Sequence, residues 1–342
     1  MKPRSSSLVI DPAWFRSDAV SSDVLAFNER LLRLMEEEPP VDEVSPQLSR
    51  RIREEGTPRT GRLVFSPSAV ERSIPGPRGE IPLRIFFPSE IRGAYLHFHG
   101  GGWVLGSARH QDSYLEALAK KIGCVVISVE YALAPEHPYP AAPDDCEAAA
   151  QWLIENSRRE FGTQRLLVGG ESAGAQLAVG TLLRLKNSRA AVCGAGAAGA
   201  GGEAGTGFAG ANLSYGVYDL TGTPSMRNWG KRRLVLNTPV MFWFAEQFVP
   251  SSLRGDPDVS PLFASSEALA GLPPALFTVG TFDLLLDDSL FMASRWTAAG
   301  SHAELAVYPG GVHGFVLLNY SLGKKARERA EEFLEACLAG GV

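Results

Sequence analysis

A serine held between two glycines, in Gly170-Glu-Ser-Ala-Gly174, limits what this 342-residue chain can fold into. The apolar run Leu166–Val168 precedes it and is typical of a buried strand, while the residues that follow it, to about Lys186, favour a helix. Ser172 therefore lies at the apex of a predicted strand–turn–helix unit. The flanking glycines have no Cβ, so the strand and the helix can pass close to each other. The free N–H groups at the start of the helix face the serine.

Predicted strands and helices alternate through most of the chain, which indicates an α/β fold with a mostly parallel sheet. Strands are expected at 63–65, 69–74, 83–87, 94–99, 124–131, 166–168, 211–217, 275–280 and 303–308. Helices are expected at 24–35, 113–122, 146–157 and 321–338. Two more are expected, one that follows the serine and runs to about residue 186, and one that ends at residue 299. Gly76–Gly79 has the composition of a hairpin turn, so the sheet should begin with antiparallel strands. The proline-rich segment 132–145 and the glycine–alanine stretch 193–207 are predicted loops, and we expect the second to be mobile.

Composition and charge exclude several classes of function. The formal net charge is −5, and lysine and arginine are spread along the chain, so there is no basic stripe for a nucleic acid. No apolar run reaches the roughly 18 residues that a membrane span needs, and Met1–Asp11 lacks the apolar core of a signal peptide. The four cysteines, at positions 124, 146, 193 and 337, show no C-x-x-C spacing. We therefore expect a cytoplasmic protein with no metal and no cofactor.

A nucleophilic serine needs a base to take its proton and a carboxylate to orient that base. The candidate base is His313, since it alone of the six histidines lies on a strand-exit loop downstream of Ser172. The candidate acid is Asp283, which comes first after the predicted strand before that one. Asp287 and Asp288 compete for the role, but Asp287 should fall one helical turn later and cap the helix or face solvent. The chain order is then serine, aspartate, histidine.

The negative oxygen of a tetrahedral intermediate needs backbone N–H donors aimed at it. Three consecutive glycines follow the predicted strand that ends at His99, and glycines there let the backbone approach a ligand closely. Gly101 and Gly102 are two candidate donors. Ala173, directly after the serine at the predicted helix start, is the third. These residues form the predicted oxyanion hole.

Together these motifs resemble the bacterial branch of the hormone-sensitive lipase family of serine esterases. The residues that carry the resemblance are His99-Gly-Gly-Gly-Trp103, Tyr131 through Pro140, Gly170–Gly174, Asp283 with Leu284, and His313-Gly-Phe315. It implies an α/β-hydrolase fold with a mostly parallel, eight-stranded sheet flanked by helices, in which the order serine, aspartate, histidine is expected. It also implies a carboxylesterase for esters with short to medium acyl chains. The sequence departs from the family at Glu171, Ala175 and Ala132, where Asp or Thr, Gly and Arg are usual.

The resemblance also divides the chain. It implies a helical cap made of residues 1–55 and 221–261 on a core made of residues 56–220 and 262–342. Trp14, Phe15 and Phe242–Phe244 are the large apolar residues of the cap, and we expect some of them to wall the substrate pocket. The family often pairs across its edge strand, so Ala303–Tyr308 is a candidate homodimer seam. Two alternatives stay open: an amidase or deacetylase with the same triad, and a small-ligand receptor on the same fold, although such receptors typically lack the histidine.

Overall fold

A computed structural model describes residues 8–57, 61–193 and 205–341. One eight-stranded sheet runs through the described residues in the order β1-β2-β4-β3-β5-β6-β7-β8. The strands are β1 (Val70–Gly76), β2 (Gly79–Phe86), β3 (Gly93–Phe98), β4 (Cys124–Val129), β5 (Leu166–Glu171), β6 (Gly210–Ser214), β7 (Ala275–Phe282) and β8 (Ala303–Val312). β1 pairs antiparallel with β2 and β2 with β4, while all other neighbours are parallel. This is the α/β-hydrolase architecture that the sequence predicts.

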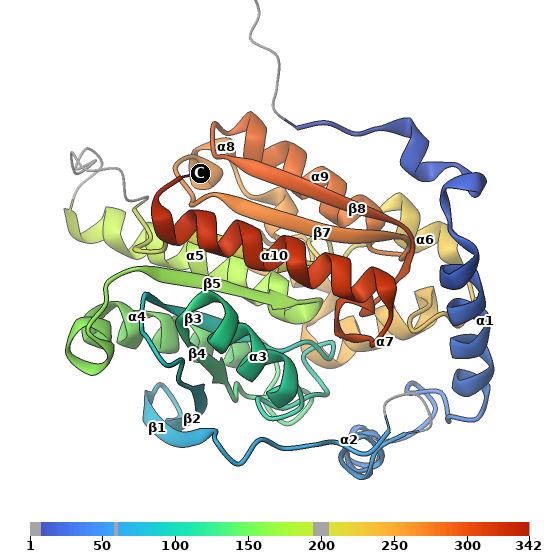
Figure 1. Ribbon diagram of the computed structural model, residues 1–342, viewed down its shortest axis with the longest axis horizontal. Coiled ribbons are helices and arrows are strands. Elements are labelled where there is room, and N and C mark those ends of the chain that lie inside the picture. The colour runs from blue at the N-terminus through green and yellow to red at the C-terminus, as the bar shows by residue number, and fades with distance from the viewer. Residues whose placement is uncertain (1–7, 58–60, 194–204, 342) are drawn as a thin grey trace, which may run out of the picture.

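Helices cover both faces of the sheet (Figure 1). On one face, α3 (Asp112–Ile122) lies over β2 and β4 and α10 (Ser321–Ala339) lies over β6, β7 and β8, and their apolar sides share one core. On the other, α4 (Ala141–Phe161), α5 (Ala173–Cys193) and α9 (Leu286–Ala298) bury the larger core. Strands enclosed in this way read as continuous apolar runs, as in β4, where all six side chains are buried.

The two segments predicted to form the cap meet in space. The first holds α1 (Ser22–Glu36) and α2 (Pro46–Glu55), and the second holds α6 (Pro224–Trp229) and α7 (Thr238–Phe248). α1 packs beside β8 (Figure 1), where Asn28 Nδ2 donates to Gly310 O at 2.8 Å. The segments contact each other where Arg233 donates to the backbone oxygen of Glu38 and the Val235 N–H lies 3.1 Å from Met35 Sδ. The short α8 (Ser266–Leu269) lies outside both segments.

Several predicted element bounds were wrong. Leu63–Phe65 is not a strand, because it pairs with no strand of the described residues. α4 begins at Ala141, inside the predicted proline-rich loop, since Pro143 falls in the first helical turn, where no N–H donor is needed. β6 ends at Ser214 instead of 217, and β8 continues beyond 308 to Val312.

Most of the glycine–alanine stretch 193–207 lies outside the described residues, so its predicted mobility stays a prediction. Within the described ranges, no helix is both long enough and apolar enough to cross a membrane.

Candidate active site

Ser172 occupies the turn between β5 and α5 with a backbone φ of 58°. This left-handed conformation is unfavourable for residues that carry a side chain. The Ser172 N–H donates to Ser214 O on β6 at 2.9 Å, which ties the turn to the sheet. A Cβ on either Gly170 or Gly174 would overlap the carbonyl oxygen of Phe98 on β3. The glycines therefore allow the close crossing of strand and helix that the sequence predicts.

The structure brings the predicted serine, histidine and aspartate together. His313 follows β8, and its Nε2 lies 2.9 Å from Ser172 Oγ. Its Nδ1 lies 2.9 Å from the Oδ2 of Asp283, which follows β7 and is buried. A carboxylate only accepts hydrogen bonds, so Nδ1 carries the proton and Nε2 of the neutral ring offers a lone pair to the serine hydroxyl. The other carboxylate oxygen of Asp283 accepts the N–H of Leu285 at 2.9 Å.

The two competing aspartates lie elsewhere. Asp287 Oδ2 accepts the N–H of Ser225 at 2.8 Å. Asp288 is fully buried, and its Oδ1 accepts the N–H groups of Tyr218 at 2.6 Å and Asp219 at 3.0 Å. Burial raises the pKa of Asp288 to about 7. Both carboxylates thus anchor the segment after β6 to the start of α9.

The glycine run after β3 lies directly against the serine turn. A Cβ on Gly100 would come within 2.9 Å of Glu171 O. Gly101 and Gly102 have φ values of 135° and 61°, and a Cβ on them would overlap Leu105 O and the Phe244 ring, respectively. Only glycine fits these positions without strain. The third predicted donor, Ala173, is the first residue of α5, where N–H groups have no acceptor within the helix.

Buried polar side chains hold the glycine run, and their role could not be read from the sequence pattern alone. The Tyr131 hydroxyl donates to His99 O at 2.6 Å, and the two rings stack with centroids 4.2 Å apart. Burial lowers the pKa of His99 to about 3, so its ring is neutral. Trp103 Nε1 donates to Gln176 Oε1 on α5 at 3.0 Å. Tyr131 belongs to a motif that carried the family resemblance, which was the available signal.

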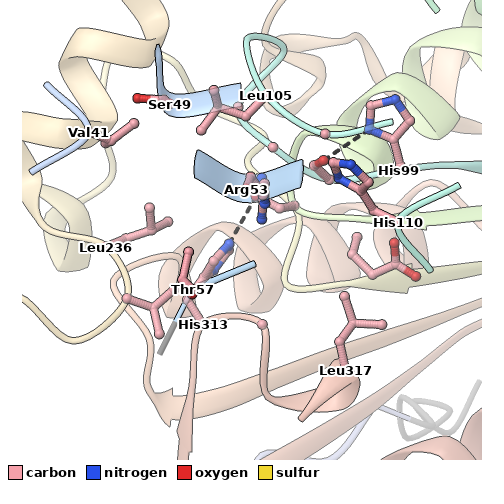
Figure 2. Close-up of a pocket in the computed structure, with 18 of the residues that line it drawn as sticks. Val41, Ser49, Arg53, Thr57, His99, Leu105, His110, Leu236, His313 and Leu317 are labelled. Atoms are coloured by element: carbon pink, nitrogen blue, oxygen red, sulfur yellow. Dashed lines mark hydrogen bonds between the residues drawn. The ribbon is translucent and has the colours of Figure 1, made fainter. Parts of the chain in front are cut away.

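A cavity of about 620 Å³ opens beside Ser172 and His313. Figure 2 shows Val41 and Leu236, one from each of the two segments predicted to form the cap, around the same space as His313 and Leu317. Of the predicted aromatic wall, only Phe244 lines this cavity. Trp14, Phe15, Phe242 and Trp243 do not line it, so one of the five residues meets the expectation that some of them wall the pocket.

Across 8–57, 61–193 and 205–341, no three His, Cys, Asp or Glu side chains are grouped so that they could hold a metal ion.

Comparison with known proteins places this arrangement among the α/β-hydrolases. A family model described as the alpha/beta hydrolase fold matches residues 95–317. The carboxylic ester hydrolase LipN of Mycobacterium tuberculosis is 36% identical over 277 residues, which is 79% of this chain and 70% of LipN. The ethyl acetate hydrolase of Pseudomonas putida is 31% identical over 75% of this chain and 77% of that protein.

Among solved structures, the thermostable carboxylesterase EstE1, cloned from a metagenomic library, superposes with a TM-score of 0.74 at 31% identity. That match covers 86% of this chain and 98% of EstE1. A thermostable esterase from Pseudomonas putida superposes with a TM-score of 0.76 at 28% identity, over 93% of this chain and 98% of that chain.

Proposed function

This chain belongs to the hormone-sensitive-lipase-like family of α/β-hydrolases and is a carboxylic ester hydrolase, and we propose that it cleaves esters with short to medium acyl chains through Ser172, His313 and Asp283. The observation that supports this mechanism best is the continuous pair of 2.9 Å hydrogen bonds from Ser172 Oγ through the His313 ring to Asp283.

In the proposed reaction, His313 Nε2 accepts the hydroxyl proton of Ser172 while Oγ forms a bond to the ester carbonyl carbon. The carbonyl oxygen becomes an oxyanion, and the N–H groups of Gly101, Gly102 and Ala173 donate to it. When the tetrahedral intermediate collapses, the bond to the alcohol oxygen breaks and that oxygen takes the proton from His313. The acyl group stays on Oγ as an ester.

Water completes the proposed cycle. His313 takes a proton from a water molecule, whose oxygen attacks the acyl carbon and forms a second oxyanion in the same site. Collapse of this intermediate returns the proton to Ser172 Oγ and releases the carboxylic acid. Asp283 stays ionised throughout, holding the ring orientation and stabilising the imidazolium form.

The preference for short to medium acyl chains rests on the shape of the cavity. Its volume of about 620 Å³ is typical of a small-molecule site. Apolar side chains of both cap segments, such as Val41, Leu236 and Phe244, wall it. A walled space of this kind favours soluble esters over long-chain triglycerides.

The proposal also covers the oligomeric state and the cellular compartment of the enzyme. β8 is one of the two edge strands of the sheet, and pairing of its edge between two copies is the homodimer that we propose. The thiols of Cys124, Cys146 and Cys337 are free, which fits a reducing compartment such as the cytoplasm. A receptor without activity has little support, since His313 stands within hydrogen-bond distance of Ser172.

The test is a substrate series with p-nitrophenyl acetate, butyrate, octanoate and palmitate beside p-nitrobutyranilide, run with wild type and Ser172→Ala. We expect the highest kcat/KM on acetate, butyrate or octanoate, little turnover of the anilide, and loss of nearly all activity in Ser172→Ala. A folded Ser172→Ala protein that keeps more than a few per cent of the activity would disprove the nucleophile assignment. Faster turnover of the anilide would identify an amidase.

A further inference from the structure

The residue before the nucleophile carries a buried carboxylate that the proposed mechanism does not use. Glu171 is the last residue of β5 and is only 3% exposed, although it borders the cavity. Its Oε2 lies 3.0 Å from His97 Nε2 and 3.1 Å from Gln111 Nε2, and Oε1 lies 3.2 Å from the same histidine nitrogen. A buried carboxylate is costly unless it is paired, so this arrangement calls for an explanation.

The two partners of Glu171 stand at opposite ends of the glycine loop. His97 is on β3, two residues before the run His99–Gly102, and its Nδ1 lies 3.1 Å from Ser128 Oγ on β4. Gln111 is the residue directly before α3, where the loop ends. One carboxylate next to the nucleophile therefore contacts the chain on both sides of the predicted oxyanion donors.

The backbone of the loop already lies against the serine turn, since a Cβ on Gly100 would come within 2.9 Å of Glu171 O. Packing limits how closely the loop can approach Ser172, and Trp103 Nε1 ties the end of the glycine run to Gln176 on α5 at 3.0 Å. Hydrogen bonds to a carboxylate are stronger than those between neutral groups, and here they bind the loop at both ends.

We propose that Glu171 is a positioning residue for the ester hydrolysis proposed above: through His97 and Gln111 it clamps the glycine loop to the nucleophile turn and so sets the distance from Gly101 and Gly102 to the oxyanion. Such donors act over a narrow range of distances, about 2.7–3.1 Å, so a small displacement weakens them in the transition state. Glu171, which stands where the family usually has Asp or Thr, thus has a positioning role in this chain.

Loss of the clamp should weaken binding of the transition state and leave binding of the substrate nearly unchanged. Glu171→Ala should lower kcat for p-nitrophenyl butyrate about 10- to 100-fold, because loss of one oxyanion donor typically costs 100- to 1000-fold and misplacement should cost less. KM should stay within about twofold. A trifluoromethyl ketone, which adds to the serine and forms an oxyanion, should bind more weakly by a similar factor.

Gln111→Ala gives a milder test, because it removes one end of the clamp and leaves the carboxylate paired with His97. It should reduce kcat and trifluoromethyl ketone affinity severalfold and in parallel. The double variant with Glu171→Ala should lose less than the product of the two single losses, since both remove the same contact.

The control is Asp258→Ala, which likewise deletes a carboxylate with close polar contacts, here a half-buried one that contacts Arg184 and Tyr139. It should lower Tm and leave kcat and ketone affinity unchanged.

Two outcomes would disprove the proposed role of Glu171. One is an unchanged kcat in folded Gln111→Ala and Glu171→Ala. The other is a loss of kcat with unchanged ketone affinity, which would indicate a merely structural effect. Neither outcome touches the proposed function, which fails only if Ser172→Ala stays active.

Discussion

Gly102 stands so close to Phe244 that a Cβ on the glycine would overlap the phenyl ring. This contact joins the glycine loop to α7 of the second segment predicted to form the cap. In Gly102→Ala either the ring or the loop must move, and the φ of 61° adds strain. We expect kcat/KM for p-nitrophenyl butyrate to fall at least about 10-fold, as for a weakened oxyanion donor.

The matched control for Gly102→Ala is Gly162→Ala. Gly162 has a similar φ of 70°, but a Cβ there meets no atom within 4 Å. It should lose about 1 kcal/mol of stability from the left-handed conformation and keep full activity. Equal losses of activity in the two variants would show that strain, and not the clash with Phe244, causes the effect.

The backbone conformation of Ser172 leads to a prediction about stability. An L-residue in the left-handed region costs about 1 kcal/mol relative to glycine, and Ser172 has a φ of 58°. Ser172→Gly should therefore unfold at a higher urea concentration than Ser172→Ala, with a difference of about 1 kcal/mol. Both variants lack the hydroxyl, so the comparison isolates the backbone. An equal or lower midpoint for the glycine variant would mean that the turn stores no such strain.

The acid assignment predicts unequal effects of two neighbouring substitutions. Asp283→Asn should lower kcat about 10⁴-fold, because the amide no longer holds the His313 tautomer that can accept the serine proton. Asp287→Asn should change kcat less than about threefold, since the amide oxygen can still accept the N–H of Ser225. Steady-state kinetics on p-nitrophenyl butyrate decides, and a larger loss in the second variant would reverse the assignment.

Asp288 predicts how stability depends on pH. Burial raises its pKa in the folded protein to about 7, above the unfolded value of about 3.9. Between these values the native state binds more protons than the unfolded state, so this group makes the free energy of unfolding fall as pH rises from about 4 to 7. Asp288→Asn removes this term and keeps an acceptor for Tyr218 and Asp219.

The measurement for Asp288 is urea unfolding of wild type and variant from pH 4 to 8. The stability of Asp288→Asn relative to wild type should rise over this range and level off above about pH 7. A difference that does not vary with pH would show that Asp288 has an ordinary pKa in the folded protein.

Phe244 should also limit acyl length. Phe244→Leu widens the cavity next to the glycine loop, so the ratio of kcat/KM for octanoate to that for acetate should rise about 10-fold, within the 10- to 200-fold that one methylene can be worth in a hydrophobic pocket. Trp243→Leu, on the same helix but outside the cavity lining, should leave the ratio unchanged. A similar shift in both variants would indicate a general loosening of α7.

The parts of the fold that local chemistry determines could be predicted from the sequence. The turn at Ser172 is one, because the crossing near Phe98 leaves no room for a Cβ at either flanking glycine. The placement of Asp283 and His313 at strand ends is another, since the carboxyl ends of parallel strands share one edge of the sheet.

Features that depend on neighbours distant in sequence could not be predicted. Leu63–Phe65 has strand-like residues, but it pairs with none of the strands that the structure describes; instead the Arg109 guanidinium stacks on Phe65 with its carbon 3.9 Å from the ring centroid. β8 continues through Pro309 because it is an edge strand, where one side needs no N–H donors. Which α7 aromatics face the cavity likewise depends on how that helix packs on the core.

The cap that we propose over Ser172 is joined from stretches far apart in the chain, since Arg233 and Glu38 are 195 positions apart where they meet. Neither stretch contains Ser172, Asp283 or His313. Insertions, deletions and substitutions in this cap can therefore accumulate while the three residues of the proposed triad stay in place. In evolution or in directed engineering, such a protein can acquire a new range of esters by changing its cap, with no alteration of that triad.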